Sequence, residues 1–382
     1  MANETLSKAK AEKNDEFYTQ YHDIEREMEA YLEYDPNVFQ GKTVLLPCDD
    51  PEWSNFTRYF AQNFERLGLK KLISTSYAHE SKKYKGPIQL TLFETEAPQY
   101  DASKTSTHGK IFILTRDTTG DGRINIDDLE WQYLEGDGDF RSKEIRALRD
   151  EADIIVTNPP FSLFREFVAW LMEAEKKFII IGNMNAITYK EIFPLIKENK
   201  MWLGNGFHNG NAFFRTANAK EYANGVYDES TGLVKFRNCC WFTNLDHGRR
   251  HQPLQLMTIA DNFKHSKHKE IRERKEYLHY DNYDAIEVPY TDAIPSDYGG
   301  VMGVPISFLD KYCPEQFEIL WRGGDIEWCE TKCDFYTPPS KEKAEHYRRQ
   351  DKTWRIQNPY ILDEQGNAVV VYQRILIRKK QS

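Results

Sequence analysis

Short apolar runs alternate with amphipathic stretches over roughly the first 250 residues. Consecutive apolar residues at 42–47, 70–77, 110–116, 153–157 and 178–183 predict strands, as do 87–95 and the later runs 201–206 and 234–245. Apolar residues recur at helical spacing in 21–34, 53–68, 144–151, 163–177 and 188–200. Continuously apolar strands separated by helices predict an α/β fold with a parallel sheet covered on both faces.

The pattern changes near residue 250. Beyond it the sequence is basic, rich in Tyr and punctuated by Pro and Gly, and the alternation of strands and helices is lost. We therefore predict a first domain over 1–250 and a smaller, irregular α+β module over 251–382. A chain of 382 residues with 40% hydrophobic residues is long enough for two such cores.

The chain carries a net negative charge, but one of its segments is basic. A net charge of −9 requires that any contact with nucleic acid come from a local patch. Such a patch lies between 246 and 280, and we name its eight cations as candidate DNA contacts: Arg249, Arg250, Lys264, Lys267, Lys269, Arg272, Arg274 and Lys275. Tyr277, Tyr280 and Tyr283 could add aromatic surfaces. A solvated helix with i,i+4 charge pairs is the structural alternative, and both can be true of one helix.

Three further features of the sequence concern a membrane span, a zinc site and a calcium site. No apolar stretch approaches the roughly 20 residues that span a bilayer, so we expect a cytoplasmic protein. The six cysteines, including Cys329 and Cys333, lack the paired spacing of a zinc site and are expected to be reduced thiols. Residues 117–128 follow the spacing of a calcium loop, but Thr119 and Asp128 depart from that motif and a strand precedes it, so a surface turn is favoured.

The strand at 153–157 ends in the run Asn158-Pro159-Pro160-Phe161. The Asn side chain offers a carbonyl acceptor, and the two prolines remove backbone donors, so carbonyl oxygens can face a cleft. Two convergent acceptors suit a planar amino group, and the aromatic side chain could stack on the ring that carries it. A tight turn with a core Phe is the structural alternative.

Several stretches in the same order resemble the adenine-specific DNA methyltransferases of the EcoRI methylase type. The matching stretches are NDEFYT (14–19), LLPCDDPEWSNF (45–56), EGDGDFRS (135–142), ADIIVTNPPFSLFREFV (152–168), KKFIIIGNMNAITYKEIF (176–193), WFTNLD (241–246), YDNYDAIEV (280–288) and DYGGVMGVP (297–305). The resemblance therefore covers most of the chain.

This resemblance implies a Rossmann-like class I methyltransferase fold that binds S-adenosylmethionine and methylates N6 of a flipped adenine. It implies that Asn158 and Pro159 accept from the N6 amino group, next to Pro160, and that Phe161 stacks on the base. The implied cofactor contacts are Phe17, Tyr18, Thr19, Pro47, Cys48, Asp49, Asp139, Phe140 and again Asn158. No metal is expected, because a sulfonium is already an activated electrophile.

Two departures from the family's pattern concern the cofactor. The PCDD loop at 47–50 has no glycine where many methyltransferases have a glycine-rich loop, so Pro47, Cys48 and Asp49 are assigned by position. The strand at 70–77 ends in Ser and Thr rather than in the acid expected for the ribose hydroxyls. The ribose partner is therefore left open.

The partners follow from the same resemblance. Double-stranded DNA is the expected substrate, with 1–250 as the catalytic domain and 251–382 as the target-recognition module. A cognate restriction endonuclease acting on the same site is a possible functional partner, and we expect a monomer. An RNA base or a protein glutamine as acceptor, or a nonenzymatic DNA-binding protein that retains the fold, are the alternatives.

Overall fold

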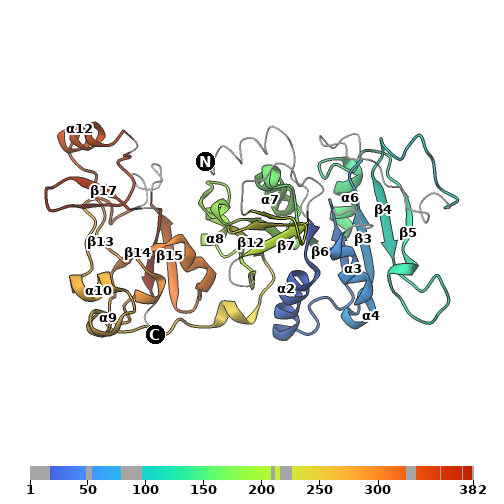
Figure 1. The fold of residues 1–382 in the computed structure, drawn as a ribbon, viewed down its shortest axis with the longest axis horizontal. Coiled ribbons are helices and arrows are strands. Elements are labelled where there is room, and N and C mark those ends of the chain that lie inside the picture. The colour runs from blue at the N-terminus through green and yellow to red at the C-terminus, as the bar shows by residue number, and fades with distance from the viewer. Residues whose placement is uncertain are drawn as a thin grey trace. The chain divides into compact units, whose positions relative to one another are not determined.

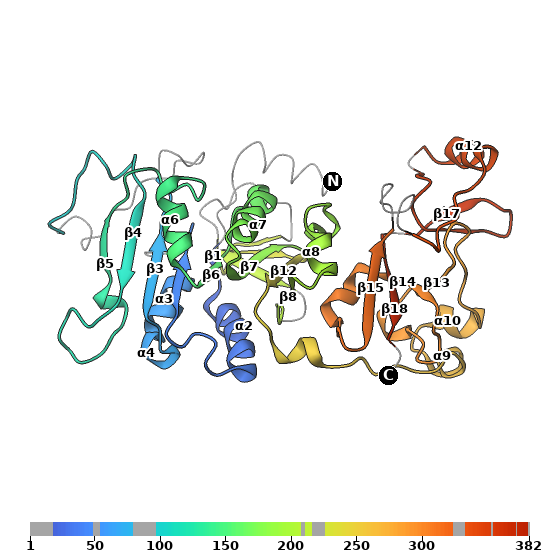
Figure 2. The same cartoon turned by 180° about the vertical axis from the view of Figure 1, so that it is seen from behind.

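The computed structural model describes residues 18–48, 54–78, 97–207, 211–215, 226–323, 333–352, 354–371 and 373–380. They form two compact units, shown from opposite sides in Figures 1 and 2. The first unit comprises the described residues of Met1–Ile192 and Met201–Gly248, and the second those of Phe193–Lys200 and Arg249–Ser382. The strand expected at 87–95 lies outside the described residues. Within the described ranges, none of the helices combines the length and the apolar character needed to cross a membrane.

An eight-stranded sheet forms the centre of the first unit, in the order β5-β4-β3-β2-β6-β7-β12-β8. The four inner strands run parallel: β3 (Lys71–Thr75), β2 (Thr43–Leu46), β6 (Ile154–Thr157) and β7 (Lys177–Asn183). The outer strands pair antiparallel: β5 (Glu130–Tyr133), β4 (Lys110–Leu114), β12 (Cys239–Thr243) and β8 (Trp202–Leu203).

The expectation of a wholly parallel sheet was therefore wrong at both edges, although the α/β class is present. The segment between β4 and β5 contains a short 3-10 turn, Ile126–Asp128, rather than a crossover helix. A parallel neighbour requires a crossover of a dozen or more residues, usually helical, whereas a returning loop leads to antiparallel pairing.

Helices cover the sheet on both faces. The segment α3 (Asn55–Gln62) and α4 (Phe64–Leu67) connects β2 to β3, and α7 (Phe164–Glu173) connects β6 to β7 in the opposite direction along the sheet. Right-handed crossovers then place these helices on opposite faces. The remaining two follow the same division, with α2 (Tyr21–Tyr34) beside α3 and α6 (Lys143–Glu151) beside α7 (Figure 1).

The main core lies under α2 and α3. Alternate residues of the inner strands point to this face, because side chains alternate along a strand. The core includes Ile24, Met28, Tyr31, Val44, Leu46, Phe56, Phe60, Leu72, Ile154, Val156, Ile179, Ile181 and Trp241. Burial of this apolar set is the main term that holds the inner strands and these helices together.

Two helices are shorter than the apolar periodicity predicts, because Gly and Pro residues fix where they begin and end. The helix expected at 53–68 is divided at Asn63 and ends at Gly68, which takes the left-handed conformation with φ 62°. The helix expected at 188–200 is only α8 (Phe193–Lys197), preceded by a 3-10 turn at Met184–Thr188. Pro194 has no N–H to donate, so it is tolerated only in the first turn of a helix.

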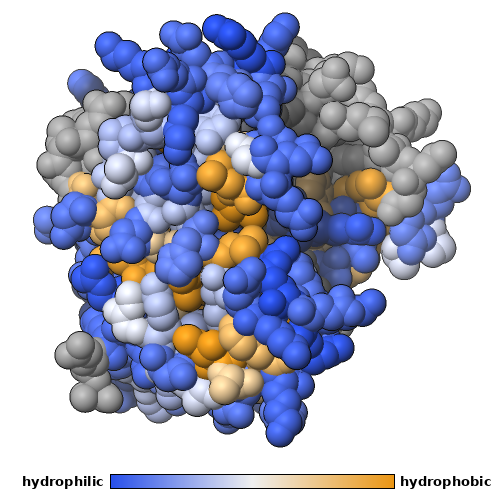
Figure 3. Space-filling view, turned by 90° about the vertical axis from the view of Figure 1, so that its left-hand side faces the viewer, coloured by the Kyte–Doolittle hydropathy of each residue, from blue (hydrophilic) through white to orange (hydrophobic). Residues whose placement is uncertain are grey.

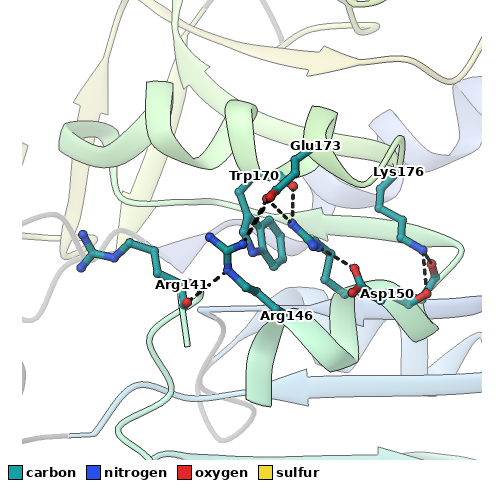
Figure 4. Close-up of polar contacts among 8 residues, drawn as sticks. Arg141, Arg146, Asp150, Trp170, Glu173 and Lys176 are labelled. Atoms are coloured by element: carbon teal, nitrogen blue, oxygen red, sulfur yellow. Dashed lines mark hydrogen bonds and ion pairs between the residues drawn. The ribbon is translucent and has the colours of Figure 1, made fainter. Parts of the chain in front are cut away.

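A polar clamp joins α6 to α7 on the other face of the sheet (Figure 4). The buried Arg149 guanidinium donates to the Trp170 carbonyl oxygen at 2.8 Å and to Glu173 Oε2 at 3.0 Å, and it lies over the Trp170 ring. Lys176 Nζ donates to the carbonyl oxygens of Asp150 and Ala152 at 2.8 and 2.7 Å, at the end of α6. These contacts fix the two helices that flank β6.

A second, four-stranded sheet belongs to the same unit. It has the order β1-β9-β11-β10, with β1 (Tyr18–Thr19), β9 (Ala212–Arg215), β11 (Leu233–Phe236) and β10 (Tyr227–Asp228). All of its pairs are antiparallel. One face carries Phe214, Val234 and Phe236, and Phe214 and Val234 are fully buried.

The second unit is built on the sheet β13-β14-β18-β15. Its strands are β13 (Ala285–Glu287), β14 (Val301–Pro305), β18 (Arg374–Lys379) and β15 (Phe317–Arg322). Around it are α9 (Ile259–His265), α10 (Lys269–Arg274), α12 (Lys341–Gln350) and the hairpin of β16 (Tyr360–Leu362) with β17 (Ala368–Val370). Helix α8 also belongs to this unit, where Phe193 packs edge-on against Trp321.

Tyr280 and Tyr283 lie in the core of the second unit, so the idea that they offer aromatic surfaces to DNA was wrong. Tyr280 is 5% exposed and Tyr283 2% exposed. The Tyr280 hydroxyl donates to Glu287, which also binds Arg374 through two guanidinium nitrogens. Tyr283 donates to the Gln357 carbonyl oxygen at 2.6 Å. Burial of a Tyr is favourable when its hydroxyl finds such an acceptor.

We expect Arg149→Met to destabilise the first unit by about 2–3 kcal/mol, because it leaves the Trp170 carbonyl oxygen and the Glu173 carboxylate without a buried donor. Arg146→Met is the matched control: Arg146 is partly exposed and pairs with the same carboxylate at 3.3 Å, so about 0.5 kcal/mol or less is expected. Urea unfolding of both variants measures the difference. Equal losses would show that the buried position of Arg149 contributes nothing extra.

Candidate active site

The carboxyl ends of β2 and β6 meet at the point where the sheet's winding reverses. From β2 the chain crosses to β3 on one side, whereas β6 and β7 lie on the other side. In open α/β sheets this switch point is where ligands bind. Here the Thr157 hydroxyl, the last side chain of β6, donates to the Pro47 carbonyl oxygen at 2.5 Å. The predicted cofactor loop and the predicted catalytic run are thus joined directly.

The run that follows β6 continues straight into α7. Asn158 is half-buried and its side-chain oxygen is shielded from solvent, while Pro159 is buried and Pro160 half-buried. Pro160 has φ −54° and ψ 122° and precedes a 3-10 turn, Phe161–Leu163. The pyrrolidine rings therefore hold the backbone in a fixed path between strand and helix.

Phe161 is held by aromatic side chains of the second sheet. Its ring lies edge-on to Phe214 of β9, with centroids 6.5 Å apart, and to Phe236 of β11 at 6.2 Å. Phe161 itself is only partly buried. Edge-on neighbours restrain the orientation of a ring, which suits a ring that stacks on a ligand.

The glycine-free turn after β2 is made by Cys48. This residue has φ 65°, a conformation that glycine adopts freely and other residues adopt at a cost. Cys48 thus supplies the left-handed turn for which the sequence offered no glycine. Its partner in the prediction, Asp49, lies outside the described residues.

The two described residues of the FYT stretch form β1. Tyr18 pairs with Arg215 and Thr19 with Phe214, which places them on the sheet that holds Phe161. The Thr19 carbonyl oxygen accepts from Asn55 Nδ2 at 2.7 Å, at the start of α3. Phe17, the third candidate of this stretch, lies outside the described residues.

The loop 135–142 packs against the end of β3. The Ala78 amide donates to the Asp137 carbonyl oxygen at 2.7 Å, and Gly138, with φ 83°, lies so close to Ser76 that a Cβ would fall 2.2 Å from its carbonyl oxygen. Burial, and then the charges of Asp137 and Asp139, raise the pKa of Tyr77 to about 12. Two carboxylates from this loop therefore stand at the end of β3, which itself ends without one.

Asp139 and Phe140 have partners of their own. Asp139 Oδ2 accepts from the Arg141 guanidinium at 2.6 Å, and Oδ1 accepts from the Arg141 amide at 2.8 Å. Phe140 is 3% exposed and packs edge-on against Phe167 and Trp170. Arg141 therefore holds both oxygens of the Asp139 carboxylate in one orientation.

The serine hydroxyls at the end of β3 are used internally. Ser74 Oγ lies 2.9 Å from Thr57 Oγ1 of α3, and Ser76 Oγ accepts from the Lys110 amide of β4 at 3.1 Å. Both side chains are buried. Sequence analysis could not identify Asp137 or Tyr77, because the loop reaches β3 from 60 residues away in the chain; the acidic Gly-Asp repeat was the one signal.

Most of the eight candidate DNA contacts in the second unit are engaged by protein groups. Arg249 pairs with Asp310 at 2.5 Å, Lys267 with Asp292 at 2.7 Å, Lys269 with Glu273 at 3.4 Å and Arg274 with Glu270 at 3.0 Å. Arg250 donates to Asn199 and Arg272 to the Ser266 carbonyl oxygen. Lys264 and Lys275 are exposed and have no ion pair within the described part of the chain.

The 117–128 loop is closed by its own amides. Asp117 accepts from the amides of Gly120 at 2.5 Å and Gly122 at 2.8 Å, and Asp128 accepts from those of Thr118 at 2.8 Å and Asn125 at 3.0 Å. These bonds hold the pKa of Asp128 well below its usual range, with the Asn125 amide as the largest cause. Elsewhere too, the described residues contain no group of three His, Cys, Asp or Glu side chains that could hold a metal ion.

We expect Cys48→Gly to keep the midpoint of thermal unfolding or raise it, because glycine takes φ 65° without the roughly 1–2 kcal/mol cost of a Cβ. Cys48→Val should lower it clearly, since a branched side chain fits this conformation worst. Cys333, which lacks a positive φ, is the control position. Calorimetry should give Cys333→Val a higher unfolding midpoint than Cys333→Gly. If the Gly and Val variants rank in the same order at both positions, the left-handed turn assigned to Cys48 is contradicted.

Comparison with known proteins completes this picture. A family model described as "Adenine-specific methyltransferase EcoRI" matches residues 5–380. The Type II methyltransferase M.EcoRI of Escherichia coli is 43% identical over 321 residues, which are 83% of this chain and 89% of that protein. Type II methyltransferase M.MpnI of Mycoplasma pneumoniae is 34% identical over 82% of this chain and 84% of its own length. No solved structure matches the chain. The chain belongs to the EcoRI-type family of adenine-specific DNA methyltransferases.

Proposed function

We propose that this methyltransferase transfers the methyl group of S-adenosylmethionine to N6 of an adenine flipped out of duplex DNA, at the carboxyl ends of β2 and β6. The bond from Thr157 to the Pro47 carbonyl oxygen carries the proposal, because it joins the loop that would meet the cofactor to the run that would meet the base. The switch point between these strands supports a Rossmann-like class I arrangement, with the antiparallel outer strands as an elaboration.

Asn158 and Pro159 hold the amino group in this proposal. The Asn158 side-chain oxygen and the Pro159 carbonyl oxygen each accept one N6 hydrogen, which leaves the nitrogen lone pair directed at the methyl carbon. The nitrogen forms a bond to that carbon as the carbon–sulfur bond breaks, and the nitrogen then loses a proton to solvent. Because Asn158 is fixed between a buried strand and two prolines, most of the rate gain comes from alignment.

Phe161 stacks on the flipped base. Its edge-on contacts with Phe214 and Phe236 keep the ring in place while leaving it partly exposed. Extrusion of a base costs a few kcal/mol of lost stacking and pairing, and an aromatic face in the pocket returns part of that energy.

The residues at the strand ends fit S-adenosylmethionine, which when bound supplies a methyl carbon activated by a sulfonium. The left-handed turn at Cys48 directs the chain away from β2 at the carboxyl end of that strand. Asp137 and Asp139 bring acceptors to the end of β3, where the amino and hydroxyl groups of an adenosine are donors. We propose Asp139 for the adenine amino group and Asp137 for the ribose, with Tyr18 and Thr19 beside the methionine part.

Duplex DNA is the proposed partner, and we propose that the module 251–382 recognises its target sequence. The relatives are named Type II methyltransferases, which supports a cognate restriction endonuclease that acts on the same site. We propose a monomer, because methylation of one strand at a time needs no symmetric partner. A DNA-modifying enzyme must meet DNA, so we place its action in the cytoplasm of a bacterial cell.

Asn158→Ala should reduce methyl transfer to plasmid DNA by about 10²- to 10³-fold or more, because one of the two acceptors for the amino group is removed. Tritiated methyl transfer to duplex DNA, RNA and protein measures the rate and the acceptor class, and calorimetry measures the binding of S-adenosylmethionine, which we expect to persist.

The exposed Asn37 of the same unit offers a matched control, Asn37→Ala, with the activity of the wild type. Near-normal turnover of Asn158→Ala would refute the mechanism. Methyl transfer by the wild type to RNA or protein in preference to DNA would refute the proposed substrate.

Phe161→Leu should lower methyl transfer by about 10- to 100-fold, the equivalent of roughly 1–3 kcal/mol of base stacking. The fluorescence of 2-aminopurine placed at the modified adenine, once single-molecule sequencing has located it, reports base flipping directly. Phe213→Leu, on the outer side of β9, is the control that should leave both signals unchanged. Wild-type fluorescence in Phe161→Leu would argue that the ring serves only the core.

A further inference from the structure

Helix α12 and the residues that follow it form a second basic segment of the second unit. Between Ser340 and Ile356 there are six Lys or Arg against three acids, in a chain whose net charge is −9. The cations are Lys341, Lys343, Arg348, Arg349, Lys352 and Arg355. All six are exposed.

Four of these cations have no ion pair within the part of the chain that the structure describes: Lys341, Arg348, Lys352 and Arg355. The Arg355 guanidinium donates to the carbonyl oxygens of Lys352 and Trp354, so the other three are the candidates for binding a partner. Lys341 and Arg348 lie seven residues apart on α12, on the same side of the helix, and Lys352 follows two residues beyond its end at Gln350. Helix α10 differs, because there Lys269 and Arg274 pair with glutamates of the same helix. The charge of α12 is therefore more available to a partner than the charge of α10.

One side of α12 is anchored in a small aromatic core. Ala344 and Tyr347 are buried against Trp354 and Tyr360, and the rings of Tyr347, Trp354 and Tyr360 lie 5.4–5.7 Å apart by their centroids. The Ser340 side chain caps the helix by accepting from the Lys343 amide. A helix supported in this way presents its exposed side chains with little loss of backbone conformational entropy on binding.

Two further contacts tie this core to the rest of the unit. Asn282, which is fully buried, donates through Nδ2 to the carbonyl oxygens of Ile356 and Asn358, and its Oδ1 accepts from the Tyr360 amide. The Tyr360 hydroxyl donates to Asp281 at 2.8 Å. Helix α12 is thus mounted on the segment that leads into β13, rather than on a loose terminus.

Figure 3 shows the face of the second unit from the side on which Figure 1 places α12. Hydrophilic residues cover the upper part of this face, and apolar surface is gathered near its middle. The exposed residues of α12 are charged or polar, so the helix itself offers little apolar area for a stable protein interface. It matches the width of the DNA major groove and the charge of its phosphates.

We propose that α12 and the turn that follows it bind duplex DNA, with Lys341, Arg348 and Lys352 in contact with phosphates. This proposal rests on the proposed function, because it names the surface through which the second unit would hold the DNA substrate. Contacts of this kind are insensitive to base sequence and fix the position of a protein on the duplex. They also make binding dependent on salt, since each neutralised phosphate releases bound counterions.

The test is the triple variant Lys341→Gln, Arg348→Gln and Lys352→Gln in the full chain. Binding to a fluorescein-labelled duplex is measured by anisotropy over a series of salt concentrations. The dissociation constant at low salt should rise about 10-fold or more, and the slope of log K against log salt should fall by about 2–3, because three phosphate contacts are lost. Binding of S-adenosylmethionine should stay unchanged.

The control is a second triple variant with the same change in charge: Lys42→Gln, Lys70→Gln and Lys177→Gln. These exposed lysines stand at the amino ends of β2, β3 and β7, at the opposite end of the strands from the site. If both triple variants unfold at the wild-type midpoint and give identical salt slopes, the assignment of α12 is overturned. It is also overturned if the α12 triple variant keeps wild-type binding to duplex DNA and loses only binding to single-stranded RNA. A wild type that binds duplex DNA but transfers no methyl group would instead overturn the proposed function.

Discussion

The hydrogen bond from the Thr157 hydroxyl to the Pro47 carbonyl oxygen joins the two strand ends on which the site is built. Strands β2 and β6 are adjacent and parallel, so their carboxyl ends emerge side by side. The loops that leave them go to opposite faces of the sheet and would diverge without a link between them. A buried hydroxyl with one acceptor keeps the turn at Cys48 in register with Asn158.

The surrounding structure supports that link from three directions. The clamp of Arg149 on Trp170 and Glu173 sets the distance between the helices before and after β6. The second sheet places aromatic rings against Phe161, and the loop 135–142 closes on the end of β3 through the amide of Ala78. Each support uses buried or backbone partners, which lose more free energy when broken than exposed pairs do.

Electrostatics are distributed differently in the second unit. Its one buried ion pair, among the residues described, joins Glu287 to Arg374 and serves the core together with Tyr280. On the surface, Lys269 and Arg274 of α10 pair with glutamates of the same helix, whereas Lys341 and Arg348 of α12, and Lys352 just beyond its end, have no ion pair among the described residues. The two helices carry similar sequences of charge, so the partners available in space decide which charge is open to a ligand.

The amino-acid sequence by itself determined the α/β class, the order of the inner strands and helices, and the position of the Asn-Pro-Pro-Phe run at a strand end. These are local properties, because periodicity, proline and glycine act over a few residues. The sequence also identified the family, because several of its motifs occur in the family's order. Only the tertiary structure decided that the outer strands are antiparallel, that Cys48 replaces a glycine, that Asp137 reaches the end of β3, and that Tyr280 and Tyr283 are core residues. Each of these depends on which distant segments meet, and a single sequence records that only indirectly, since many pairings satisfy the same local pattern.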